Sequence, residues 1–326
     1  MEALLFATFL GKAAWIWLVF FGIVGVLMAL DLGILHKDQH EIGVRESLLL
    51  SAGYISISLL FGLWVWWELG QDSALDYYTG YIIEKSLSID NIFVMAIIFS
   101  ALYIPRKFQH RVLFWGVIGV IVLRGVMIGV GAAIVHQYEW VLYIFAAFLI
   151  FTGFKLLFMK DEGEHGKDVE NNPIIRFLKS HFKICDLHEQ RFFVRLPDTK
   201  TGKMAWHMTP LFLALVTVEF ADLIFAVDSV PAIFAITTDP YIVFTSNIFA
   251  ILGLRSLYFA LSAMIERFAY LKYALALVLI FIGSKVFLTP LLGLEKFPAS
   301  VSLGVTLGIL TVGIVYSLYK TKKIHG

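Results

Sequence analysis

Residues 218–231 read Val-Glu-Phe-Ala-Asp-Leu-Ile-Phe-Ala-Val-Asp-Ser-Val-Pro, and they place three carboxylates in a stretch that is otherwise apolar enough to lie in a membrane. Residues 84–94 read Glu-Lys-Ser-Leu-Ser-Ile-Asp-Asn-Ile-Phe-Val and repeat the same spacing of acid, aspartate and polar residue. We therefore expect two acidic helices to organise the chain. The corresponding positions are Glu84 with Asp222, Asp90 with Asp228, and Asn91 with Ser229.

The composition of the chain is that of a polytopic membrane protein. Of the 326 residues, 59% are hydrophobic and 16% are charged, and the mean hydropathy is +0.82. Soluble domains carry about 25% charged residues. The net charge of +1 gives no reason to expect a nucleic-acid partner, and the single cysteine excludes an internal disulfide.

The hydrophobic pattern predicts nine membrane-spanning helices, since about 20 apolar residues cross a bilayer. Lys and Arg number 19 in one set of connections and 2 in the alternate set. Because short basic loops stay in the cytoplasm, we expect the amino terminus outside and the carboxyl terminus inside. The predicted spans are residues 15–35, 47–67, 81–103, 112–135, 140–158, 207–236, 242–264, 271–289 and 299–319.

Spans 3–5 and 6–8 look like two copies of one unit. The sequence Leu-Ile-Phe-Thr-Gly-Phe-Lys at 149–155 recurs as Leu-Ile-Phe-Ile-Gly-Ser-Lys at 279–285, and Leu-Arg-Gly at 123–125 recurs as Leu-Arg-Ser at 254–256. A unit of three helices must be inverted in its second copy, as in many secondary transporters. The expected organisation is a two-helix extension (1–80), repeat 1 (81–158), a cytoplasmic loop (159–206), repeat 2 (207–289), and a last helix with its tail (290–326).

The acidic helices need a polar interior, because an ionised side chain at the centre of a span costs about 2.5–3.5 kcal/mol on insertion scales. Positions seven apart share a helix face, so Glu84 should lie with Asn91 and Asp222 with Ser229, whereas Asp90 and Asp228 should point elsewhere. For all of them to reach one site, both helices must bend or break. Pro231 would supply the cause in the second helix.

The available ligands are hard oxygen donors, which favour Mg²⁺, Ca²⁺ or Mn²⁺ over copper or zinc. An alternative is that Arg124 and Arg255 neutralise Asp90 and Asp222 in static pairs. The candidate metal ligands are Glu84, Asp90, Asn91, Glu219, Asp222, Asp228 and Ser229. Accessory candidates are Asp31, Arg124, Asn247, Arg255, Lys155 and Lys285.

Simpler interpretations compete for several of these residues. Asp31 and Glu219 could be interfacial charges, and Asn247 could be a hydrogen bonder between helices. We expect Lys85, Lys155 and Lys285 to extend toward the interface from span ends. Two further sets of residues, one in the long loop and one aromatic, also have simple interpretations. The loop histidines and cysteine match no zinc spacing and fit a solvated loop (His165, His181, Cys185, His188). Five aromatic residues fit an outer interfacial belt (Trp64, Trp66, Trp67, Tyr77, Tyr78).

The motifs at 84–94, at 225–234 (Phe-Ala-Val-Asp-Ser-Val-Pro-Ala-Ile-Phe) and at 251–255 (Ile-Leu-Gly-Leu-Arg) resemble those of the TerC family of membrane proteins, most closely its Alx-type members. The resemblance covers about residues 22–316. The family is associated with manganese export and tellurite resistance, and its architecture is similar to that of the lysine-exporter superfamily. The resemblance thus implies metal roles for the four paired acids, and it selects Mn²⁺ where ligand type does not.

The expected function is therefore export of Mn²⁺ across an inner membrane by alternating access, with proton exchange as the simplest coupling. The metal would be cargo, and no cofactor is expected. The bilayer is the expected partner, and the sequence does not give the oligomeric state. Other hypotheses are a membrane scaffold or tellurite-resistance complex subunit, an exporter of another small solute, and an intramembrane aspartyl protease. The protease lacks support because no Gly-x-Gly-Asp motif surrounds the three aspartates of the two acidic helices.

Overall fold

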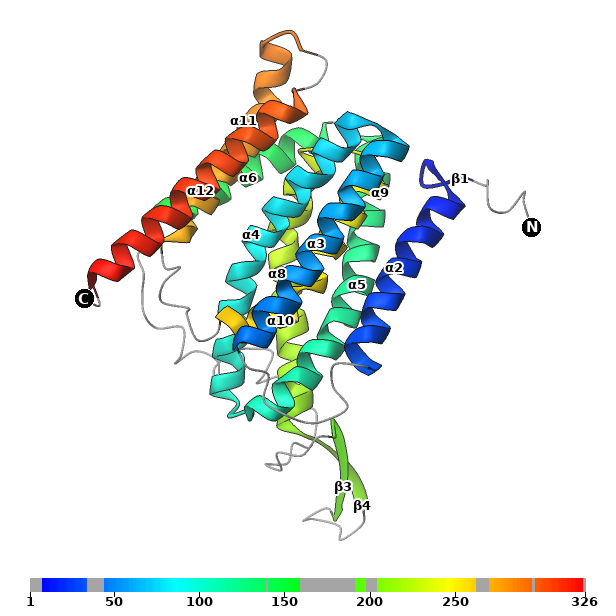
Figure 1. Cartoon of the computed structure of the whole chain (residues 1–326), viewed down its shortest axis with the longest axis vertical. Coiled ribbons are helices and arrows are strands. Elements are labelled where there is room, and N and C mark those ends of the chain that lie inside the picture. The colour runs from blue at the N-terminus through cyan, green and yellow to red at the C-terminus, as the bar shows by residue number, and fades with distance from the viewer. Residues whose placement is uncertain are drawn as a thin grey trace.

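The computed structural model shows a bundle of long helices with two short β-hairpins (Figure 1). It describes residues 8–33, 44–138, 140–158, 191–197, 204–261, 270–294 and 297–324. The helices are α2 (Ala14–Gly33), α3 (Val44–Leu69), α4 (Gln71–Ala101), α5 (Arg106–Gln137), α6 (Val141–Phe158), α8 (Pro210–Phe234), α9 (Pro240–Leu252), α10 (Leu254–Leu261), α11 (Leu271–Leu291) and α12 (Ala299–Ile324). The strands are β1 (Thr8–Phe9), β2 (Lys12–Ala13), β3 (Phe193–Pro197) and β4 (Met204–Met208).

Within these described residues, seven helices are long and apolar enough to cross a membrane, which confirms a mostly helical, multi-pass membrane protein. The prediction of nine spans adds two crossings to these. One is α2, whose apolar stretch, Ala14–Leu30, is shorter. The other is α4, which has 31 residues and carries several charged side chains of the first acidic motif. The seven are Arg45–Leu69, Arg106–Gln137, Val141–Phe158, Pro210–Phe234, Pro240–Ala260, Lys272–Leu291 and Ala299–Lys320.

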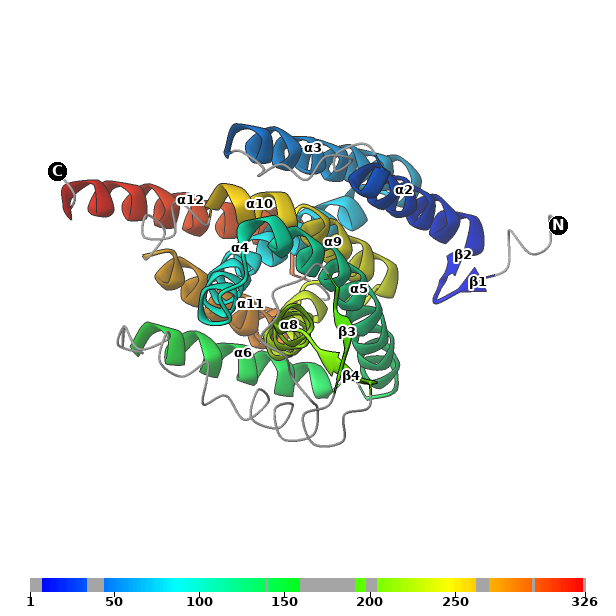
Figure 2. The ribbon, with the colours of Figure 1, turned by 90° about the horizontal axis from the view of Figure 1, so that it is seen from below.

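The acidic helices occupy the centre of the bundle. Seen from below, α8 is viewed end-on near the middle, α2 and α3 lie on one flank, and α6 lies on the opposite flank (Figure 2). Helix α8 packs against α4, α5 and α6, while α4 also packs against α9 and α12. The side chains of α4 and α8 are therefore held against neighbouring helices on several sides, as their charges require.

The helix breaks differ from those expected. Both α4 and α8 run as single helices, and α8 continues through Pro231. The interruption lies in predicted span 7, where α9 ends at Leu252 and α10 begins at Leu254. Lys85 Nζ donates a 3.0 Å hydrogen bond to the carbonyl of Ala250, in the last turn of α9. The expectation that Lys85 extends to the interface is therefore wrong.

Helices α6 and α11 approach each other at two glycines. A Cβ atom on Gly153 would lie 2.7 Å from the carbonyl oxygen of Ala276 and 2.6 Å from the Ile280 side chain. A Cβ atom on Gly283 would lie 2.6 Å from the carbonyl oxygen of Ala146 and 2.8 Å from the Ile150 side chain. As residue numbers rise along α6 they fall along α11, so the two helices are antiparallel. Only residues without a side chain permit this separation.

An aromatic cluster joins α2, α3, α4 and α9. Phe20 lies 5.7 Å from Phe249, and Phe61 lies 4.6 Å from Phe249, between ring centroids. Tyr77 is fully buried in this cluster and donates a 3.0 Å hydrogen bond from its hydroxyl to the carbonyl of Ser58. Trp67 is exposed, as a lipid-interface residue would be, but Tyr77 is a core residue rather than part of an interfacial belt.

The two hairpins lie toward opposite ends of the bundle (Figure 1). The β1–β2 hairpin is tied to the start of α9 by an ion pair of 2.9 Å between Lys12 Nζ and Asp239 Oδ2. Asp239 also caps α9, because its Oδ1 accepts a 3.0 Å hydrogen bond from the Tyr241 amide. The β3–β4 hairpin comes from the predicted loop 159–206 and pairs Arg195 with Trp206. The loop histidines and Cys185 lie outside the described residues.

Candidate functional site

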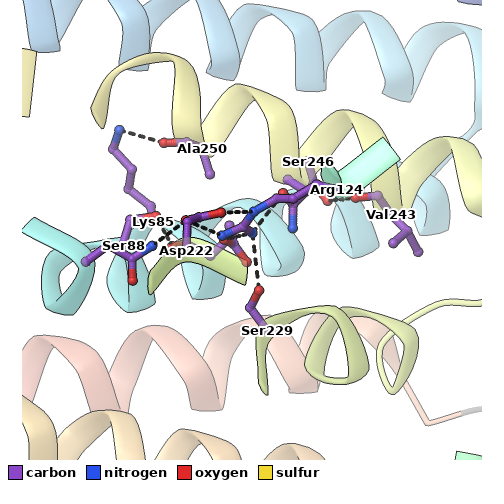
Figure 3. Close-up of polar contacts among 11 residues, drawn as sticks. Lys85, Ser88, Arg124, Asp222, Ser229, Val243, Ser246 and Ala250 are labelled. Atoms are coloured by element: carbon purple, nitrogen blue, oxygen red, sulfur yellow. Dashed lines mark hydrogen bonds and ion pairs between the residues drawn. The ribbon is translucent and has the colours of Figure 1, made fainter. Parts of the chain in front are cut away.

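The centre of the site is Arg124, which reaches from α5 to α4, α8 and α9 (Figure 3). Its side chain is 1% exposed, so the guanidinium is removed from solvent and must be balanced inside the bundle. Its five N–H groups form a rigid planar fork suited to carboxylate partners. The structure thus places a permanent cation between the two acidic helices.

The first acid of each motif, Glu84 or Asp222, binds this guanidinium. Asp222 on α8 accepts hydrogen bonds from Nε at 3.2 Å and from Nη2 at 3.1 Å, in a two-point contact. Glu84 on α4 forms an ion pair with Nη1. Glu84 and Asp222 are 1% and 2% exposed. Two buried carboxylates meet one guanidinium here, so the fully ionised group carries an excess negative charge.

The polar motif residues complete the same cluster. Asn91 Nδ2 donates a 2.9 Å hydrogen bond to Asp222 Oδ1, which joins α4 to α8. Ser229 Oγ lies 3.2 Å from Arg124 Nη1, and Asn247 Oδ1 accepts from the same nitrogen at 3.0 Å. The seven-residue spacing therefore correctly predicted one inner face on each acidic helix. Asn247 bridges α9 to α5, as the interhelical interpretation expected.

Several polar atoms of this cluster are unused. Glu84 Oε2, Asn91 Oδ1 and Asn247 Nδ2 are buried and have no hydrogen-bond partner among the described residues. Orphaned buried polar atoms are costly, and they call for a functional explanation. In the part of the chain that the structure describes, no three His, Cys, Asp or Glu side chains form a metal-binding group. A cation here would therefore depend on amide and hydroxyl oxygens as well as on Glu84 and Asp222.

Glu219 lies beside the cluster without joining it. Both of its carboxylate oxygens are buried and lack hydrogen-bond partners among the described atoms. They face α5 at Gly116 and Gly119, where added Cβ atoms would lie 3.3 Å and 2.4 Å from the nearest carboxylate oxygen. The two glycines were not among the predicted site residues, although their three-residue spacing places them on one helix face. Their lack of side chains lets the carboxylate approach the helix.

Other candidates lie away from Arg124. Arg255 Nη1 lies 3.2 Å from His110 Nε2. Lys285 is buried and donates a 3.2 Å hydrogen bond to Ser302 Oγ, so it does not extend to the interface, whereas Lys155 is exposed. The side chains of Asp31, Asp90 and Asp228 lie outside the described part of the structure.

Comparison with known proteins places this chain in a family. The model of the integral membrane protein TerC family matches residues 69–325. An uncharacterized membrane protein of Rickettsia bellii is 45% identical over 305 residues, covering 93% of this chain and 97% of the relative. A relative from Myxococcus xanthus is 44% identical over 307 residues, covering 94% and 93%. A protein of Escherichia coli named as a proposed membrane-bound redox modulator, Alx, is 43% identical over 314 residues, covering 93% and 94%. No solved structure matches the chain significantly.

Proposed function

This chain belongs to the TerC family of integral membrane proteins, and we propose that it exports divalent metal ions, above all Mn²⁺. One observation carries the proposal: carboxylate, amide and hydroxyl groups of two motif-bearing helices converge on a single buried point, and a positive group already lies there. A site that stabilises a guanidinium inside a membrane bundle offers negative potential to other cations. The protein would act as a transporter rather than an enzyme.

The donor set supports a hard divalent cargo. Glu84, Asp222, Asn91 and Ser229 offer oxygen atoms, and two of these oxygens, Glu84 Oε2 and Asn91 Oδ1, have no partner among the described residues. Oxygen donors suit Mg²⁺, Ca²⁺ and Mn²⁺. The family resemblance, rather than ligand chemistry, favours Mn²⁺ within this group. Asp90 and Asp228 are proposed as further ligands from their places in the motifs.

Alternating access between two inverted three-helix units is the proposed mechanism. It is supported by the equivalent positions of Glu84 and Asp222 on α4 and α8, which bind one guanidinium. It is also supported by the antiparallel contact in which Gly153 and Gly283 meet matching residues of the opposite helix. Sites in such transporters lie where the repeats meet. The amino terminus would lie outside the cell and the long 159–206 loop inside.

Proton exchange is the coupling that we propose. Two carboxylates that lose a shared cation raise each other's proton affinity, so release of metal favours uptake of protons. Mn²⁺ flux into proteoliposomes at fixed membrane potential should therefore rise when the lumen is made more acidic than the medium, so that protons leave as Mn²⁺ enters. Flux that is insensitive to the gradient would remove this coupling and leave the metal site in place.

Transport by the purified protein in liposomes is the decisive test. The wild-type protein should carry Mn²⁺, and both Glu84→Gln and Asp222→Asn should reduce the rate at least tenfold, because each removes a charge from the cluster. Glu68→Gln is the matched control, since Glu68 is exposed on α3 and should leave flux unchanged. Equal flux in all four proteins would place the transport site elsewhere.

A scaffold role is the second candidate, and the favouring observation is that Arg124 already pairs with both Glu84 and Asp222. Removing one partner of a buried ion pair costs about 3–5 kcal/mol, so the cluster can hold the bundle together without transport. A scaffold would show no flux of any solute in liposomes. One relative is named a redox modulator. This chain has a single cysteine, Cys185, so it cannot form a dithiol pair within one copy.

A further inference from the structure

The carboxylate of Glu219 poses a problem that the central cluster does not solve. Among the described residues, Glu219 has two buried carboxylate oxygens and no hydrogen-bond donor for either. An unpaired buried carboxylate is costly, and proteins pair or ligate such groups. The place it occupies is formed by the absence of side chains at Gly116 and Gly119 of α5. The two glycines therefore give the carboxylate space but no hydrogen-bond donor.

Arg124 is a guanidinium of α5 that already contacts α8, through Asp222. Glu219 is three residues before Asp222 on α8, a rise of about 4.5 Å. On α5, Gly119 is five residues before Arg124. Gly119 lies against Glu219, and Arg124 contacts Asp222. Residue numbers therefore rise in the same direction along both helices, so α5 and α8 are parallel. Long side chains on a helix lean toward its amino terminus. The Arg124 side chain thus points along α5 toward Gly119, where the Glu219 carboxylate lies.

A divalent cation and the guanidinium compete for the same two carboxylates. Arg124 uses Glu84 Oε1 and both oxygens of Asp222, and a metal bound by the free Glu84 Oε2 and by Asp222 would lie against the same groups. The guanidinium and a divalent ion held by the same carboxylates would repel each other strongly, because the bundle interior screens charges far less than water does. A displaced guanidinium cannot stay unpaired in the bundle interior. It needs a second carboxylate.

We propose that Arg124 is an exchangeable internal counter-ion, which binds Glu84 and Asp222 when the site is empty and moves to Glu219 when a divalent cation binds. This inference rests on the proposed function and adds a competitor and a receiving residue to it. Glu219 then acts through Arg124 and is a positioning residue, in contrast to the direct metal ligand suggested by its sequence alone. With the metal bound, the guanidinium and the divalent cation together carry three positive charges, which match the three carboxylates of Glu84, Asp222 and Glu219.

A double-mutant cycle on Mn²⁺ binding tests the exchange in the purified full-length protein, with calorimetry as the readout. Arg124→Gln removes the competitor and should bind Mn²⁺ at least tenfold more tightly than wild type. Glu219→Gln removes the receiving group and should bind at least fivefold more weakly. In the Arg124→Gln background, Glu219→Gln should change Kd less than twofold. The conservative Arg124→Lys variant should stay within about threefold of wild type, because it keeps the competing charge.

Each other outcome has a defined meaning. Weaker or unchanged binding in Arg124→Gln overturns the exchange. A fivefold loss from Glu219→Gln that persists without Arg124 also overturns it, because Glu219 would then be a metal ligand. Absence of Mn²⁺ binding by the wild-type protein overturns the proposed function and this inference together, whereas additive effects in a protein that binds Mn²⁺ overturn the exchange alone.

A second pair of variants keeps both charges and serves if Arg124→Gln does not fold. Gly119→Ala puts a methyl group 2.4 Å from a Glu219 oxygen and displaces the carboxylate, so Mn²⁺ binding should weaken at least fivefold. Gly129→Ala is the matched control on α5, because its Cβ meets no atom within 4 Å. Wild-type affinity in Gly119→Ala would contradict the exchange.

Discussion

Gly153 and Gly283 occupy equivalent places in the contact between α6 and α11. Gly153 faces Ala276 and Ile280, and Gly283 faces Ala146 and Ile150, so each contact becomes the other when 130 is added to or subtracted from the residue numbers. A contact that maps onto itself in this way is typical of a two-fold relation between partners. The same offset relates the Gly-x-Lys sequences from which the repeat was predicted.

Alanine at either glycine should destabilise the bundle. The added methyl group would meet a backbone carbonyl at 2.7 Å in Gly153→Ala and at 2.6 Å in Gly283→Ala, so the helices must separate. We expect each variant to lose about 1–3 kcal/mol of stability, measured by thermal unfolding in detergent. Gly304→Ala on α12 is the control, since its Cβ meets no atom within 4 Å. Equal stability of all three variants would contradict the close approach.

Cysteine labelling should reveal opposite sides for two connections. In a Cys185→Ser background, a cysteine in place of Asp72, which is exposed at the start of α4, should react with an impermeant reagent from outside the cell, and one at 161–170 only after the membrane is opened. The reason is the strong excess of Lys and Arg in the second connection and its neighbours. If both positions react from the same side, the inverted arrangement and the transport argument drawn from it are wrong.

Asp90 and Asp228 should be functional equivalents. They occupy matching places in the two motifs, and a divalent ion near the midplane requires negative countercharge. Asp→Asn at either position keeps the volume and removes one charge, so Mn²⁺ flux in liposomes should fall at least tenfold while the amount of protein in the membrane stays the same. Wild-type flux in both variants would show that the metal site does not include these residues.

Competition should follow the preference of oxygen ligands. Mg²⁺ or Ca²⁺ in excess should displace Mn²⁺ from the purified protein more readily than Cu⁺, because Cu⁺ prefers sulfur. The measurement is retention of Mn²⁺ against increasing competitor, with Glu84→Gln as the reference for weakened binding. Tighter binding of Cu⁺ than of Mn²⁺ would overturn the assignment of ligands.

The parts of the site that follow from helix periodicity were predictable. Glu84 with Asn91, and Asp222 with Ser229, were placed on shared faces by the seven-residue spacing, and the structure brings all four to Arg124. Apolar length likewise predicted the membrane-spanning helices. Periodicity acts within one helix, so it gives faces and lengths but does not give partners.

The parts that depend on packing between helices were not predictable. Arg124 binds Glu84 and Asp222 because α5 packs against both α8 and α9, and the sequence does not give this packing. The expected break at Pro231 did not occur, since a proline in a helix can be accommodated by its neighbours. Lys285 lies near the end of a predicted span, so its side chain was expected to reach the interface. It instead donates a hydrogen bond to the hydroxyl of Ser302 on α12.

The interruption after α9 determines where this bundle can come apart. Thirteen residues make α9 about 20 Å long, which is less than the ~30 Å of a hydrocarbon layer, so its last carbonyls lie at depth. Lys85 of α4 holds one of them, that of Ala250. Separating the two helices would expose a cation and a carbonyl to lipid, each at a cost of several kcal/mol. The contact between Lys85 and Ala250 is therefore a fixed point between the two repeats, and an alternating movement of one repeat against the other would turn about it.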